Sequence, residues 1–92
     1  MLAADVRPRR GDRVLSQRAE DTVVLLDPRS GEYYALDEVG GRIWDLCDGT
    51  RTVGEIAGQI SDEYAAPASV VHADVQALLQ ELALAELVAR DV

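Results

Sequence analysis

The sequence contains no phenylalanine and no lysine, and it has a single cysteine, a single histidine and a single tryptophan in 92 residues. One cysteine cannot form an internal disulfide bond, and one cysteine with one histidine is too few for a clustered metal site. Because aromatic residues are scarce, the core must be built mainly from aliphatic side chains. A hydrophobic content of 48% allows this in one small domain.

Long apolar segments are also missing. No stretch approaches the roughly 18 consecutive apolar residues of a membrane span. The opening residues, MLAADVR, lack the apolar run of a signal peptide. We therefore expect a cytoplasmic protein with no membrane partner.

Positive charge is scarce outside the first part of the chain. The formal net charge is −8, and residues 19–92 hold 15 acidic side chains against 4 basic ones, a net of −11. Nucleic-acid affinity depends on cationic side chains that displace counterions from phosphates. This charge balance predicts that nucleic acid is not a partner.

The usual patterns of catalysis and cofactor binding are absent. Cys47 and His72 fall on different predicted helices with no third partner, whereas nucleophilic catalysis requires a nucleophile with a base within reach. We interpret Cys47 as a small buried residue and His72 as a surface residue. Gly40-Gly41 has neither the spacing of a dinucleotide fingerprint nor the lysine of a phosphate loop. The sequence therefore predicts a protein that is not an enzyme and holds no cofactor or metal.

The N-terminal segment is predicted to be a flexible tail. Residues 1–12 contain Pro8, Gly11 and three arginines, with little periodicity. Residues 13–88 then form the predicted domain.

Three strands are predicted at the start of this domain. Val14-Leu15 opens the first, residues 22–26 form the second and residues 32–36 the third, with a Pro- and Gly-containing turn that makes the last two a hairpin. The first strand is expected to join them in a three-stranded antiparallel meander. Residues 23–26 are apolar on both faces of their strand, which indicates either complete burial or a partner that covers the outer face.

Residues 37–48 are predicted to form a helix that Asp37 caps and Gly49 ends. Apolar residues recur on one face: Val39, Ile43, Leu46 and Cys47, with Trp44 at the border as a core anchor. Inside this helix Gly40-Gly41 costs about 1 kcal/mol per glycine relative to alanine. Close approach of another backbone explains this pair, and chance tolerance explains it equally well.

Two further helices are predicted. Thr52 and Glu55 fit a capping box, which begins a helix that runs to about Tyr64. Pro67 suits the first turn of a third helix, which ends near Leu84.

The third helix has a narrow apolar stripe between two different shoulders. The stripe consists of Val71, Val75, Leu78 and Leu82. Leu79 lies on one shoulder, and Asp74 and Glu81 lie on the other. The order of elements is therefore three strands followed by three helices.

Several of these segments together resemble a known family. The sequence reads TVVLLD at 22–27, GEYYALDE at 31–38, IW at 43–44, DGTRTV at 48–53 and DVQALLQEL at 74–82. This run is similar to the PqqD-like family, the precursor-peptide recognition elements of ribosomal peptide modification pathways. The resemblance covers residues 14–88. One departure is that Ala85-Glu86, where the family often has a glycine, precedes the last apolar pair.

The resemblance implies an α+β fold, a winged helix-turn-helix with a three-stranded antiparallel sheet followed by three helices. Family members bind the leader part of a precursor peptide, which adds as a strand to the free edge of the third strand and packs against the third helix. The corresponding candidate peptide-binding residues are Glu32, Tyr33, Tyr34, Ala35, Leu36, Val71, Asp74, Val75 and Leu78.

Physical reasoning assigns roles to these candidates. An edge strand offers unpaired N–H and C=O groups to an extended peptide, and side-chain pockets supply specificity. Val71, Val75 and Leu78 can floor such a pocket, although a plain core role explains them as well. Tyr33 or Tyr34, on opposite strand faces, can form its wall, and Asp74 can accept a hydrogen bond from a tyrosine or pair with a basic leader residue.

The resemblance also implies partners. The expected partners are a precursor leader peptide and a separate processing enzyme, with the cysteine peptidase of a lasso-peptide pathway favoured. The alternatives are a peptide chaperone for a radical-SAM enzyme and a winged-helix interaction or DNA-binding domain. The exposed third strand can also pair with a second copy to give a homodimer.

Overall fold

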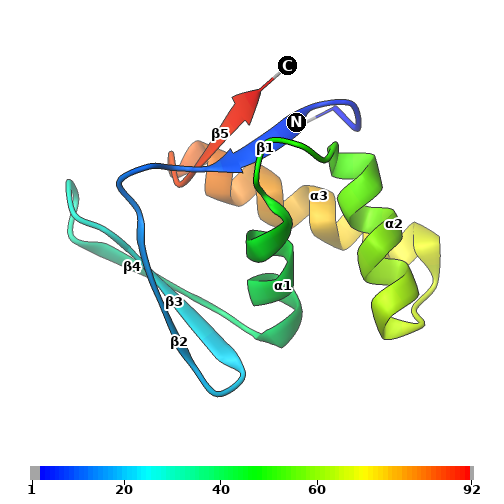
Figure 1. Cartoon of the computed structure of the whole chain (residues 1–92), viewed down its shortest axis with the longest axis horizontal. Helices are drawn as coiled ribbons and strands as arrows, with labels where there is room; N and C mark the ends of the chain where they lie inside the picture. Colours follow the sequence, from blue (N-terminus) through cyan, green and yellow to red (C-terminus); the bar gives the residue numbers. More distant parts are fainter. Residues whose placement is uncertain (1–2, 92) are drawn as a thin grey trace.

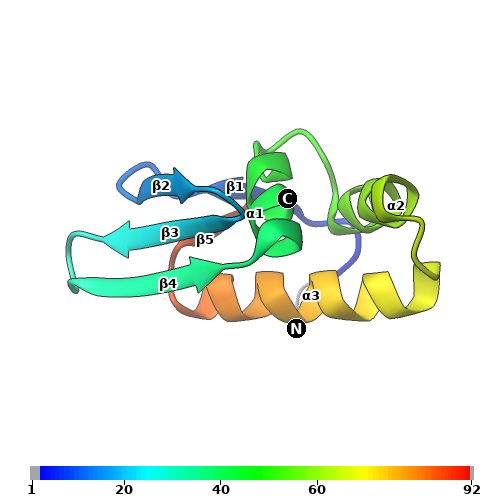
Figure 2. The same cartoon turned by 90° about the horizontal axis from the view of Figure 1, so that it is seen from below.

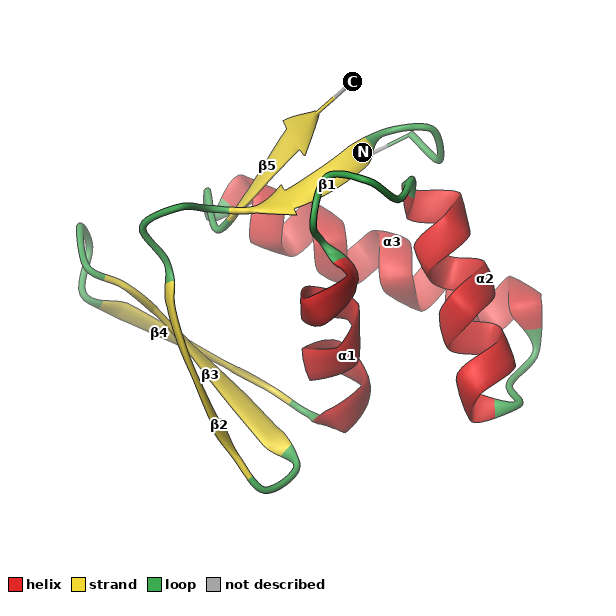
Figure 3. Ribbon diagram, viewed as in Figure 1, coloured by secondary structure: helices red, strands yellow, loops and turns green. Residues whose placement is uncertain are grey.

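The structure is a computed structural model that describes residues 3–91. The elements follow in the order β1 (Arg7–Arg10), β2 (Leu15–Ala19), β3 (Thr22–Asp27), β4 (Glu32–Leu36), α1 (Glu38–Leu46), α2 (Val53–Tyr64), α3 (Ala68–Leu84) and β5 (Val88–Asp91) (Figures 1 and 3). Strands β2, β3 and β4 form an antiparallel sheet in that order, ahead of the three helices. The predicted α+β winged-helix architecture is confirmed.

The β3–β4 hairpin follows from its turn chemistry and its alternating side chains. Gly31 takes a φ of 75°, which glycine adopts without strain, and its N–H donates to the Asp27 carbonyl at 2.8 Å. Val23 and Leu25 are buried, whereas Val24 and Leu26 are half-buried on the opposite face. The apolar run of β3 is therefore divided between the core and an outer sheet face that the described residues leave partly open.

The predicted caps begin the first two helices. The Asp37 carboxylate accepts from the Gly40 N–H at 2.7 Å at the start of α1. The Thr52 hydroxyl accepts from the Glu55 N–H at 3.0 Å, and the Thr52 N–H donates to the Glu55 carboxylate at 2.8 Å. This reciprocal pair is the capping box that the sequence predicts for α2.

Helix α3 has the predicted length but a different buried face. Its buried residues are Val71, Val75, Leu79 and Leu82, so Leu79 belongs to the core and Leu78 is only half-buried. The assignment of Leu79 to a shoulder is therefore corrected. The spacing of both leucines fits one amphipathic helix, and the packing partners of α3 select which of them faces inward.

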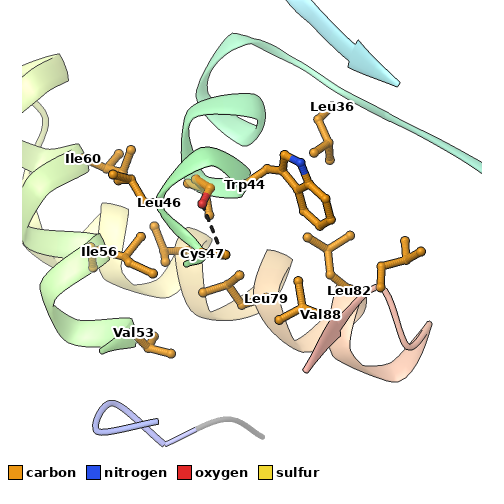
Figure 4. Packing of buried hydrophobic residues seen from close by; sticks show 14 of the residues in the cluster. Leu36, Trp44, Leu46, Cys47, Val53, Ile56, Ile60, Leu79, Leu82 and Val88 are labelled. Atoms are coloured by element: carbon orange, nitrogen blue, oxygen red, sulfur yellow. Dashed lines mark hydrogen bonds between the residues drawn. The ribbon is translucent and has the colours of Figure 1, made fainter. Parts of the chain in front are cut away.

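The core lies where the three helices meet the inner face of the sheet. Figure 4 shows Trp44 of α1 between Leu36 of β4 and Leu82 of α3, in agreement with its predicted role as a core anchor. Its side chain is 3% exposed. Aliphatic residues from α2 and from the junction between α3 and β5 also belong to the cluster: Val53, Ile56, Ile60, Leu87 and Val88.

The prediction of a flexible tail over residues 1–12 is corrected at β1. Arg7–Arg10 pairs antiparallel with β5, so the two ends of the described chain lie side by side, blue and red in Figure 1. The Val6 and Ala4 carbonyls also accept from the Val53 and Gly54 N–H groups at 2.9 and 3.0 Å, which satisfies free donors at the start of α2. A four-residue strand is too short to show periodicity, and its partner comes from the opposite end of the sequence. Met1 and Leu2 of the predicted tail lie outside the described residues.

Candidate functional site

Strand β4 forms one edge of the three-stranded sheet. In the order β2-β3-β4, one side of β4 bonds to β3, and none of residues 3–91 pairs as a strand with its other side. Figure 2 shows the strands following one another from β2 to β4 toward α3. Because an edge strand presents unpaired N–H and C=O groups, this side of β4 is open to an extended segment.

The first hollow beside this edge, the apolar hollow, has a volume of ≈ 590 Å³. It lies where the end of β4 meets α1 and the middle of α3. Its lining residues are Ala35, Leu36, Asp37, Val39, Gly40, Ile43, Asp74 and Leu78. Asp37 is engaged as the cap of α1, so Asp74 is the lining carboxylate that remains available to a ligand.

The second hollow, the acidic hollow, has a volume of ≈ 500 Å³ and lies at the other end of β4. The β3–β4 turn and the end of α3 form it together. Its lining residues are Asp27, Arg29, Ser30, Glu32, Tyr34, Leu84, Ala85 and Glu86. Both hollows are therefore bordered by β4 and by α3 or the residues that directly follow α3.

Ion pairs and one phenol define the electrostatics of the acidic hollow. The Arg29 guanidinium lies 3.1 Å from the Glu86 carboxylate and 3.8 Å from that of Asp27. The Tyr34 hydroxyl donates to Glu32 at 3.3 Å. Partial burial raises the pKa of Tyr34, and the nearby carboxylates of Glu32, Glu81 and Asp27 raise this pKa further.

The predicted site residues separate into three groups. Six of them line the hollows: Glu32 and Tyr34 the acidic one, and Ala35, Leu36, Asp74 and Leu78 the apolar one. Tyr33 is 70% exposed and points to the outer sheet face. Val71 and Val75 are 7% and 1% exposed and belong to the core.

Sequence reasoning missed the residues that other segments bring to the hollows. Val39 and Ile43 of α1 line the apolar hollow, and Asp27, Arg29 and Glu86 line the acidic one. The helical spacing of Val39 and Ile43 is a visible signal, but it does not separate a core role from a groove role. The turn residues give no periodic signal at all.

The environment of Cys47 does not suit a nucleophile. Its side chain is buried, its Sγ donates to the Ile43 carbonyl at 3.2 Å (dashed in Figure 4), and burial raises the pKa of the thiol to about 12. In the described part of the chain, no three His, Cys, Asp or Glu side chains come together as metal ligands. None of the helices within residues 3–91 has the length and apolar character that crossing a bilayer requires.

The open edge of β4, the two hollows and α3 together form a groove. The class is therefore a winged-helix domain with a groove at the edge of its three-stranded sheet. The sequence model of the family described as coenzyme PQQ synthesis protein D (PqqD) matches residues 22–88, and the chain belongs to this family. It is 36% identical over 78 residues to a PqqA binding protein of Bradyrhizobium diazoefficiens, with 85% of this chain and 73% of that protein covered.

Solved structures of related proteins have the same fold. TbiB1, solved in complex with the TbiA(beta) leader peptide, matches with a TM-score of 0.78 and 38% identity over 87% of this chain and 93% of its own. The PqqD part of Methylobacterium extorquens PqqCD, a stand-alone recognition element for ribosomally synthesized and post-translationally modified peptides, matches with a TM-score of 0.72 and 30% identity. That match covers 95% of this chain and 92% of the other.

Proposed function

We propose that this protein binds the leader segment of a ribosomally made precursor peptide and presents it to a separate processing enzyme, without a catalytic step of its own. The observation that carries this proposal is the open edge of β4 between two hollows that α3 and its C-terminal end border. The 38% identity to TbiB1, which was solved with a leader peptide, supports it.

β-Augmentation is the binding mode that this geometry favours. Main-chain hydrogen bonds to β4 supply affinity that depends little on the peptide sequence. Side chains that alternate along the added strand supply specificity by entering the hollows. In this arrangement Leu78 and Leu36 contact apolar leader side chains, and Asp74 accepts from a polar one.

The favoured receiving enzyme is the leader peptidase of a lasso-peptide pathway. Delivery to a radical-SAM enzyme is the second candidate, which the match to PqqD and the identity of 36–37% to PqqA binding proteins favour. Either role places the protein in the cytoplasm, where ribosomal precursors are made. The net charge of −8 disfavours DNA binding, the other winged-helix function. A gel shift at low salt tests for it.

Leu78→Asp tests the groove directly. We expect this change to weaken binding of a fluorescein-labelled leader peptide about tenfold or more, because it buries a charge against apolar leader side chains. The measurement is fluorescence anisotropy, with the TbiA(beta) leader and the precursor peptides of the host genome as probes. Circular dichroism checks that the variant is folded.

Leu15→Asp is the matched control, because Leu15 is 57% exposed and lies at the outer sheet face, away from both hollows. It should leave the affinity unchanged. Two further leader peptides are N-methylated, one at odd-numbered and one at even-numbered positions. Only one of the two should lose binding, because an added strand bonds to its neighbour through every second N–H. A folded Leu78→Asp protein of undiminished affinity would contradict the proposal.

A further inference from the structure

The charges at the two hollows have almost one sign. Asp27, Glu32 and Glu86 line the acidic hollow, and Asp37 and Asp74 line the apolar one. Arg29 is the single cationic side chain among the residues that line these two hollows. A peptide laid along β4 therefore enters a strongly negative potential.

The Arg29 guanidinium neutralises only part of the carboxylate charge in the acidic hollow. Its side chain contacts two carboxylates, those of Glu86 at 3.1 Å and Asp27 at 3.8 Å. It makes no ion pair with Glu32. Glu81 lies on the same face of α3 as Asp74 and Leu78, and its charge acts on the Tyr34 phenol, so carboxylate charge remains unmatched around Tyr34. Three lining carboxylates and the nearby Glu81 against one cation leave room, in charge and in volume, for a second cation.

The aromatic ring of Tyr34 lies among these carboxylates. Its hydroxyl bonds to Glu32, and Glu81 and Asp27 are close enough to affect its ionisation. The face of a tyrosine ring attracts a Lys ammonium or an Arg guanidinium. An aromatic ring with acidic neighbours is a common environment for a basic side chain and a poor one for an acidic side chain.

The lining charge differs between the hollows that border the sheet. A third hollow, on the outer face of the same sheet, is lined only by uncharged residues: Leu15, Ser16, Gln17, Ala19, Val24, Leu26 and Tyr33. A fourth hollow, which shares Asp27, Arg29 and Glu86 with the acidic one, is lined by three arginine and three acidic side chains, so its lining charges balance. In the acidic hollow three carboxylates line the wall with one arginine. The difference between the acidic hollow and the uncharged outer one indicates that the segment bound along β4 carries positive charge.

From this charge complementarity we infer that the segment bound along β4 is basic, with one Lys or Arg side chain in the acidic hollow against Tyr34, Glu32 and Glu81. The inference rests on the proposed leader binding and adds the chemistry of the peptide. A second copy of this chain is a poor occupant of the same edge, because its own β4 would bring Glu32 and the neighbouring acids into the groove.

The test is a substitution scan of the fluorescein-labelled TbiA(beta) leader peptide. Each position is replaced in turn by Lys and, separately, by Gln, and affinities are measured by anisotropy with the full chain. At one position Lys should bind about three- to tenfold more tightly than Gln, the range of a partly exposed ion pair. This preference should shrink between about 0.05 M and about 0.5 M salt.

Glu32→Gln and Glu81→Gln should each remove most of the preference for Lys, measured for each variant as the ratio of its affinity for the Lys peptide to its affinity for the Gln peptide. Glu20→Gln, the same chemical change at an exposed residue of the turn between β2 and β3, should retain it. If the leader binds but no position prefers Lys, or if the preference survives both variants, the inference is wrong and leader binding stands. If no peptide of the scan binds, leader binding itself fails.

Discussion

At the residue scale, the pair formed by Arg42 and Glu63 joins α1 to α2 through two parallel hydrogen bonds. The Arg42 Nε and Nη2 donate to the two carboxylate oxygens of Glu63, both at 2.8 Å. Hydrogen bonds from Arg42 and Gln59 lower the pKa of Glu63 to about 2. The two side chains remain 37% and 32% exposed, so water screens much of this attraction.

Glu63→Gln should therefore lower the free energy of unfolding at pH 7 by about 0.5–1 kcal/mol. The lowered pKa contributes stability above the ordinary carboxyl value of 4.5, and this contribution is lost as the pH falls toward about 2. The difference between wild type and variant should shrink over that window in urea titrations. A difference that stays constant down to pH 2 would show that the carboxylate charge is not its source.

At the element scale, Gly41 sets how closely α1 approaches the sheet. A Cβ at this position would lie 2.7 Å from Cγ2 of Val23, a buried residue of β3. Of the two explanations for the Gly40-Gly41 pair, close approach is the one that the structure supports at Gly41, although a side chain and not a backbone is the neighbour. Gly58 of α2 has no such neighbour within 4 Å and is exposed.

Gly41→Ala should lower the free energy of unfolding by about 1–2 kcal/mol, because overpacking against Val23 outweighs the gain in helix propensity. Gly58→Ala is the matched control and should raise the free energy of unfolding by about 0.5–1 kcal/mol. Both are measured by urea unfolding. Equal stabilisation by the two substitutions would mean that α1 can move away from β3 without cost.

At the scale of the whole molecule, β1 joins the C-terminal strand β5 to the C-terminal end of α1. It pairs with β5 on one side, and its Pro8 carbonyl accepts from the Gly49 N–H at 3.0 Å on the other. The Arg10 guanidinium donates to the Trp44 and Asp45 carbonyls at 3.1 and 2.7 Å, at the C-terminal end of α1. A cation is favourable there, because free carbonyls give a helix C-terminus partial negative charge.

Removing residues 1–10 should consequently lower the free energy of unfolding by about 2–4 kcal/mol, since it leaves β5 unpaired and several buried carbonyl and N–H groups without partners. Hydrogen exchange at Val53 and Gly54, which donate to this segment, should become faster. A truncated protein with unchanged stability and exchange would restore the interpretation of a flexible tail.

The sequence by itself determined the elements whose signals are local. The Asp37 cap, the Thr52 and Glu55 capping box and the bounds of β4 were all predictable, because each depends on residues a few positions apart. The resemblance to the PqqD-like family rests on the same segments.

Only the tertiary structure decided what depends on distant segments. It selected Leu79 over Leu78 for the core, paired β1 with β5, and brought Arg29 and Glu86 together in the acidic hollow. These contacts join residues that no local period connects, since their energies come from packing and pairing across the folded chain. The sequence predicted β4 as a strand with a free edge. The chemistry of the groove beside it depends on the segments of α1, α3 and the β3–β4 turn that the fold places there.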